Sequence, residues 1–205
     1  MWDNNININT MTGEKLIELF ELQVDDSSEL SSAEELDLLN ASYQEVCDDR
    51  PWEFLKAEFS GVTDGTTIVA LSSNFSYFIE MNDNGDKVIY VDGKEFILIN
   101  YSERRQYRDN TAVAYFHGTN LYFMVAPKAG LTVLGDYIKV PDDLELATEP
   151  IMPDRFHKML AYSMAISDFI IQANLSDNNS IQSNTSLFNG YMSRMQYYNG
   201  RLTNK

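Results

Sequence analysis

The sequence predicts an α+β protein, a four-helix bundle built from both chain ends with an inserted antiparallel β-sandwich or barrel-like domain. Apolar residues repeat at helical spacing near both ends of the 205-residue chain, and turn signals divide its middle into short segments. Neither helical pair alone offers enough apolar partners, so the two pairs are expected to pack together. We expect residues 10–60 and 150–205 to form the bundle, 61–146 the β domain, and 1–9 a flexible arm.

Two helices are predicted in the N-terminal part. Thr12 is placed to cap the first, whose apolar stripe is Leu16, Ile17, Phe20 and Val24. A capping box at Ser32 and Glu35 is expected to start the second, which carries Leu36, Leu39, Tyr43 and Val46. Pro51 disfavours helical geometry at Arg50 and ends it. An aromatic cluster is expected at the exit, made of Trp52, Phe54, Leu55 and Phe59.

From Gly61 the turn signals are those of a β-sheet. Asp64-Gly65, Asn84-Gly85 and Asp92-Gly93 can supply positive φ, and a further hairpin turns at 117–120. Roughly seven short strands are predicted, as in a small antiparallel sandwich or barrel. Their expected ranges are 66–71, 75–81, 87–91, 94–101, 112–116, 121–125 and 131–140.

Helical spacing resumes at Pro153, which suits the first position of a helix. Two neighbouring faces of this third helix are apolar, so we expect it to be buried. The faces are Phe156, Leu160, Ser163, Ser167 and Ile170, and Met159, Tyr162, Ile166 and Phe169. A fourth helix is predicted with a narrow stripe at steps of three and four, namely Phe188, Tyr191, Met195, Tyr198 and Leu202.

Charge and cysteine content limit the binding targets and the compartment expected for this protein. The net charge is −16, of which residues 1–64, with 16 acidic and 3 basic side chains, contribute −13. Such a chain is not expected to target nucleic acid or an anionic membrane. One cysteine, Cys47, excludes an internal disulfide and favours a reducing compartment. No signal peptide or spanning segment is recognisable, so we expect a soluble intracellular protein.

No catalytic motif is recognisable, and neither a metal site nor a cofactor is predicted. The two histidines fall on different predicted elements: His117 is expected to face solvent in a turn, and His157 to serve packing or a subunit contact. The basic cluster Arg104, Arg105 and Arg108 suggests phosphate or single-stranded nucleic acid when taken alone. Because the chain is strongly negative, we favour inter-subunit salt bridges between these arginines and the acidic N-terminal helices.

Three short motifs resemble the head-to-tail adaptors, or neck connectors, of tailed bacteriophages. They are Leu38-Leu39-Asn40 with Arg50-Pro51-Trp52, then Ala126-Pro127 with the run 136–144, then Met152-Pro153 with Phe156-His157. The resemblance implies a structural virion protein without enzymatic activity or a membrane contact. It also implies a homo-oligomeric ring, typically a dodecamer, that joins the portal to a tail or nozzle protein. Genomic DNA would pass through this ring during ejection without specific binding.

The resemblance further implies assembly in the host cytoplasm, a place at the head–tail interface of the virion, and docking of the C-terminal segment into the portal. Candidate portal-docking or subunit-interface residues are Phe188, Tyr191, Met195, Tyr198, Arg201 and Lys205. The same stripe is equally suited to completing the bundle of its own chain. A second hypothesis is a carbohydrate- or receptor-binding virion module, whose β-domain tyrosines stack on sugars: Tyr77, Tyr90, Tyr101, Tyr107, Tyr115 and Tyr122.

Overall fold

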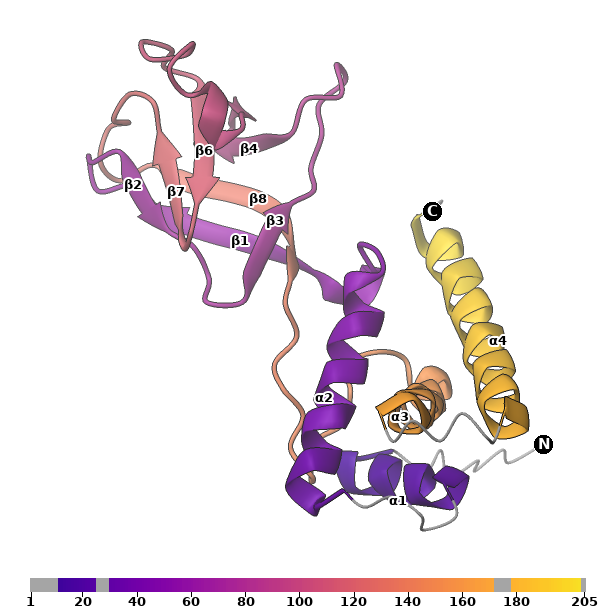
Figure 1. Cartoon of the computed structure of the whole chain (residues 1–205). Coiled ribbons are helices and arrows are strands. Elements are labelled where there is room, and N and C mark those ends of the chain that lie inside the picture. The colour runs from indigo at the N-terminus through magenta and orange to yellow at the C-terminus, as the bar shows by residue number, and fades with distance from the viewer. Residues whose placement is uncertain (1–10, 25–29, 172–177, 204–205) are drawn as a thin grey trace, which may run out of the picture. The chain divides into compact units, whose positions relative to one another are not determined.

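The computed structural model describes residues 11–24, 30–171 and 178–203, and the chain divides into two compact units (Figure 1). Met1–Phe54 and Pro141–Lys205 form a helical unit, and Leu55–Val140 form a β unit. The predicted α+β class is confirmed, with helices from both chain ends and an inserted barrel-like sheet. The predicted arm, residues 1–9, and the candidate residue Lys205 lie outside the described residues.

Four helices pack together in the helical unit: α1 (Gly13–Val24), α2 (Ser32–Asp48), α3 (Lys158–Ile171) and α4 (Asn178–Thr203). α3 contacts each of the other three, as Figure 1 shows. Five of its residues are 0% exposed, as expected for a helix apolar on a wide arc: Met159, Leu160, Ala161, Met164 and Ala165. One expectation for α3 is wrong, because Ile170 is 60% exposed. At about 100° per residue, it lies on the side of the helix opposite buried Ala161.

The beginnings of two helices differ from the prediction. α2 is capped by Ser31, whose backbone N–H donates to Oε2 of Glu34 at 2.8 Å. The expected box of Ser32 and Glu35 is wrong, because Glu35 points into the bundle and is 6% exposed. Before α3, Pro153 is extended (φ −60°, ψ 132°) and precedes a 3₁₀ turn, η3 (Asp154–Phe156), rather than occupying the first helical position.

The burial of Glu35 yields a pH-dependent prediction. Burial, together with the charges of Glu21 and Asp168, raises the pKa of this carboxyl group. A raised pKa means that ionised Glu35 destabilises the fold, and that stability is regained as the pH falls through the folded-state pKa. Glu35→Gln is therefore expected to raise the Tm by a few degrees at about pH 7.5 and to lose this advantage near about pH 4.

Thermal unfolding followed by circular dichroism checks this expectation. Asp37→Asn is the matched control, since Asp37 lies on the same helix but is exposed. A Glu35→Gln variant no more stable than Asp37→Asn at neutral pH would refute the assignment of a destabilising buried charge.

The β unit contains eight strands in one mixed sheet. Their order is β1-β8-β4-β5-β6-β7-β2, with β3 also pairing with β8, and contacts between β1 and β2 bring the sheet close to closing. β5 and β6 pair in parallel, unlike the antiparallel arrangement expected, while the other named pairs are antiparallel. The strands are β1 (Lys56–Val62), β2 (Ile68–Ala70), β3 (Phe75–Phe78), β4 (Val88–Val91), β5 (Lys94–Leu98), β6 (Val113–His117), β7 (Asn120–Phe123) and β8 (Thr132–Lys139).

β1 was not predicted. Phe59, expected in an aromatic cluster with Trp52, instead lies on β1 and is buried in the core of the sheet, where its ring meets Phe78 edge-on at 6.2 Å. Trp52 and Phe54 belong to the helical unit, with their rings stacked at 5.9 Å. The expected single cluster is therefore divided between two separate cores.

The predicted hairpin turns are present where glycine supplies the required backbone. Asp92 and Gly93 both have positive φ, 50° and 73°, between β4 and β5. His117 pairs with Asn120 across the next hairpin, so Gly118 (φ 60°) and Thr119 form its turn.

Candidate functional site

The segment 141–152 of the helical unit runs against α2. The side-chain amide of Asn40 binds the backbone of Leu144 twice: Nδ2 donates to the carbonyl oxygen at 3.1 Å, and Oδ1 accepts from the N–H at 2.6 Å. Nε2 of Gln44 donates to the Pro141 carbonyl at 3.1 Å. Two of the short motifs singled out in the sequence, one on α2 and one before α3, are thus in direct contact.

The same segment covers the beginning of α1. The N–H of Gly13 donates to the Thr148 carbonyl, and the N–H of Glu14 to the Leu146 carbonyl, both at 2.9 Å. These N–H groups have no partner within their own helix. The N-terminus of α1 is therefore completed by a segment from the other end of the chain.

His157 fixes the start of α3. Its side chain is 0% exposed, and Nε2 lies 2.7 Å from the Met152 carbonyl oxygen. A carbonyl only accepts, so Nε2 carries the hydrogen and donates it. This geometry supports the packing role predicted for His157.

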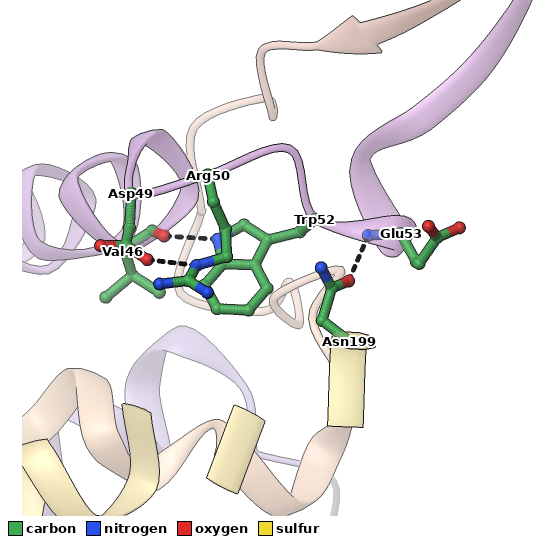
Figure 2. A network of polar contacts seen from close by, with 6 residues as sticks. All are labelled: Val46, Asp49, Arg50, Trp52, Glu53 and Asn199. Atoms are coloured by element: carbon green, nitrogen blue, oxygen red, sulfur yellow. Dashed lines mark hydrogen bonds and ion pairs between the residues drawn. The ribbon is translucent and has the colours of Figure 1, made fainter. Parts of the chain in front are cut away.

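The exit of α2 is built around Trp52, which is 0% exposed (Figure 2). Its Nε1–H donates to the Val46 carbonyl at 2.7 Å, so the buried indole has no unsatisfied polar atom. Arg50 pairs with Asp49 at 2.6 Å and places its guanidinium 5.1 Å from the centre of the Trp52 ring. The Arg50-Pro51-Trp52 motif thus forms a tightly packed turn at the end of α2, which we call the corner.

This corner is joined to the end of α4. The backbone N–H of Glu53 donates to Oδ1 of Asn199 at 2.8 Å, as Figure 2 shows. An apolar groove of about 200 Å³ lies beside the bond. It is lined by Trp52, Glu53, Phe54, Pro153, Met195, Tyr198, Asn199 and Leu202. We call it the α4 groove.

The predicted stripe on α4 faces its own unit along much of its length. Met195 is 1% exposed, Tyr191 lies 5.9 Å from the ring of Tyr162, and Tyr198 lies 6.1 Å from the ring of Phe156. Phe188 is half-buried. These residues contribute to the bundle, which was one of the two roles left open for them.

The end of α4 exposes apolar and basic side chains. Tyr197 is 69% exposed and Leu202 is 38% exposed. Arg201 is exposed beside them. Tyrosine and arginine are enriched at protein interfaces, so this end has the composition of a docking surface.

Comparison with known proteins decides the family. A family model described as SU10 adaptor protein matches residues 11–204, nearly the whole chain. This chain belongs to the SU10 adaptor protein family. The family is one of phage head–tail adaptors, which are structural virion proteins and not enzymes. No match is found among curated proteins.

Cys47 has the surroundings of a packing residue in the adaptor. Cys47 is 3% exposed, and burial raises the pKa of its thiol to about 12, as expected for a packing residue. Within the described ranges, no group of three or more His, Cys, Asp and Glu side chains is arranged to hold a metal ion. None of the helices in that part of the adaptor is long and apolar enough to span a membrane.

The predicted basic cluster lies in the β unit of the adaptor. It follows the short 3₁₀ helix η2 (Tyr101–Glu103). Arg104 is half-buried, with its guanidinium 3.6 Å from the centre of the Tyr101 ring, whereas Arg105 and Arg108 are exposed. Only two of the three arginines are thus presented to solvent.

The tyrosines offered as a sugar platform are largely used within the adaptor itself. Tyr101 has Arg104 on its ring at 3.6 Å and stacks with His117 at 4.4 Å. Tyr115 stacks with Tyr122 at 5.2 Å. Tyr101 remains 43% exposed and Tyr107 is 38% exposed, whereas Tyr115 and Tyr122 are half-buried. The ring contacts of Tyr101, Tyr115 and Tyr122 compete with stacking on a sugar, so they do not favour carbohydrate binding.

Sequence reasoning missed the α4 groove. Asn199 and Trp52 are separated by 147 positions, and nothing local links them. The available signal was Asn199 itself, one turn beyond Met195 on the inward stripe of α4. A polar side chain on an otherwise apolar stripe indicates a specific hydrogen-bond partner.

Proposed function

We propose that this protein forms a ring of twelve copies at the neck of the virion, between the portal and the tail or nozzle protein below. The supporting observation is the match of the adaptor family over residues 11–204. The ring assembles in the host cytoplasm, surrounds the DNA exit channel, and lets genomic DNA pass during ejection. The net charge of −16 suits this role because it repels the phosphates of passing DNA.

We also propose that the end of α4 docks into the portal. Tyr197, Arg201 and Leu202 provide an exposed aromatic, a cation and an aliphatic group on one helix end. The α4 groove lies beside Leu202 and offers an apolar recess to a side chain of the portal. Of the other candidate docking residues, Met195 and Tyr198 line the α4 groove, whereas Phe188 and Tyr191 lie about two to four turns further back on α4. The bond from Glu53 to Asn199 holds the helix end in place.

A paired substitution tests the docking surface. Tyr197→Asp with Leu202→Asp is expected to weaken binding to the purified portal protein of the same phage at least about tenfold, since interface centres are intolerant of charge. Tyr197 is 69% exposed, and Leu202, which lines the α4 groove in the last turn of the helix, is 38% exposed, so the helical content is expected to stay unchanged. Co-sedimentation with the portal and circular dichroism measure the two effects.

Leu22→Asp is the matched control, because Leu22 is 75% exposed on α1, away from the proposed surface. It is expected to bind the portal as the unaltered protein does. Portal binding by the doubly substituted α4 variant at the level of this control would contradict docking through α4.

A further inference from the structure

The parallel pairing of β5 and β6 forces the chain to form a long connection. Two parallel neighbours cannot be joined by a tight hairpin, because the chain must return to the end at which β5 began. Residues 99–112 make this return and include η2 and the basic cluster. We call them the crossover loop.

The crossover loop is held in place by its own contacts. Nη1 of Arg104 donates to the Tyr101 carbonyl at 2.6 Å while its guanidinium lies over the Tyr101 ring. The Tyr101 ring also stacks with His117, at the tip of the β6–β7 hairpin, at 4.4 Å and 15°, and meets the ring of Tyr115 edge-on at 5.7 Å. The N–H of Asn100 donates to Oε2 of Glu103 at 3.0 Å. The loop is therefore built as a fixed projection on the hairpin.

Two arginines of the crossover loop, Arg105 and Arg108, take no part in the contacts that hold the loop. Arg105 and Arg108 are exposed, and neither forms an ion pair among the described residues of the chain. Tyr107 between them is 38% exposed, which adds an aromatic group suited to an interface. The carboxylate of Asp109 is the acidic group beside them. A preordered loop that presents two arginines fits an acidic protein surface.

The chain itself carries a matching surface on α2. Glu34, Asp37, Ala41, Glu45 and Asp48 are exposed and fall within an arc of about 80°, over a length of about 21 Å. α2 has no basic residue in its last turn. Like charges at this spacing, and Asp48 at the negative end of the helix dipole, weaken the helix. Local stability therefore does not explain the acidic face, whereas a basic partner does.

We propose that the crossover loop of one copy binds the acidic face of α2 on the neighbouring copy, with Arg105 and Arg108 opposite Asp37, Glu45 and Asp48. This proposal rests on the homo-oligomeric ring proposed above. The two surfaces differ, so the contact is head-to-tail, the type that closes into rings rather than two-fold dimers. Exposed ion pairs mainly fix orientation and speed of assembly, so the contact is salt-sensitive.

Cross-linking between differently labelled copies tests this contact. Arg105→Cys chains and Asp37→Cys chains are mixed, assembled on the purified portal, and treated with a short bismaleimide. A cross-linked heterodimer is expected from the mixture and none from either variant alone. Native Cys47 does not interfere, because it is buried. Ser193→Cys, on exposed α4 residue Ser193, replaces Asp37→Cys in the control mixture, which is expected to give no cross-link.

A charge exchange gives a second measurement. Arg105→Glu with Arg108→Glu is expected to raise the concentration needed for assembly on the portal about tenfold at low salt. Adding Asp37→Lys and Glu45→Lys to the same chain is expected to return this concentration to that of the unaltered protein, because each copy then presents both reversed surfaces.

Three results overturn the inference. The first is wild-type assembly on the portal without the specific cross-link, and the second is no rescue by the charge exchange. The third is that the variant with Arg105→Glu and Arg108→Glu assembles normally on the portal but retains less DNA than the unaltered protein. That result would show that the crossover loop contacts DNA phosphates rather than a neighbouring copy. If the wild-type chain did not assemble on the portal at all, the proposed function would be wrong as well. If it assembled without the specific cross-link, only the proposed contact between copies would be wrong.

Discussion

Replacing Trp52 by alanine is expected to destabilise the helical unit by about 3–5 kcal/mol. The indole is 0% exposed, stacks on Phe54 at 5.9 Å and donates to the Val46 carbonyl at 2.7 Å. Alanine removes the packed ring and leaves a cavity between the exit of α2 and the end of α4. Denaturant unfolding followed by far-ultraviolet circular dichroism measures the loss.

Two further variants separate the contributions of Trp52. Trp52→Phe keeps most of the packing but removes the hydrogen bond to the Val46 carbonyl, so a cost of about 1–3 kcal/mol is expected. Tyr197→Ala, at a 69% exposed position on α4, is expected to stay within about 0.5 kcal/mol of the unaltered protein. If Trp52→Ala cost no more than Tyr197→Ala, Trp52 would not be the centre of this corner.

Gly13→Ala is expected to cost about 1–3 kcal/mol, because it forces a clash rather than a cavity. A Cβ at Gly13 would lie 2.6 Å from the carbonyl oxygen of Glu145. Relief requires the backbone of segment 141–152 to move, yet that segment accepts the first N–H groups of α1 at Thr148 and Leu146. Overpacking and loss of these hydrogen bonds therefore act together.

Gly190→Ala is the control for this prediction, with an opposite expected sign. Gly190 lies inside α4, and a Cβ there meets nothing within 4 Å. Alanine is favoured over glycine in a helix interior by about 0.8–1.0 kcal/mol, so this variant is expected to be stabilised. Equal effects of the two substitutions in thermal unfolding would show that segment 141–152 does not press against α1.

Periodicity predicted the helices well, because their buried faces follow simple spacing. Leu16, Phe20 and Val24 are buried on α1, and Met195 is buried on α4. The cap of α2 was misplaced by one residue, since Ser31 and Ser32 each precede a glutamate by three positions. Only the burial of Glu35 in the bundle distinguishes the two alternatives.

The errors in the β unit come from long-range pairing. Phe59 lies only seven residues beyond Trp52, and no local signal shows that the two rings enter different cores. The parallel pairing of Ile97 with Val113 depends on which strands become neighbours in the sheet. Residues 102–111 fall between two predicted strands, but no local signal shows that they form a crossover.

The candidate surfaces were only partly accessible from sequence. Phe188, Tyr191, Met195 and Tyr198 were identified by spacing, but their division between buried and exposed faces required the packing partner. Arg105 and Arg108 were identified by charge, whereas the use of Arg104 in holding Tyr101 depends on a ring contact that spacing does not reveal. The α4 groove depends on Asn199 meeting Glu53, which are 146 positions apart.

Electron cryomicroscopy of the intact phage particle tests the central claim most directly. The account predicts a closed ring of this chain between the portal and the tail, with the end of α4 against the portal and an open channel along the axis. Density for the chain elsewhere in the particle, for example on a tail fibre, or its absence from the neck, would contradict the account.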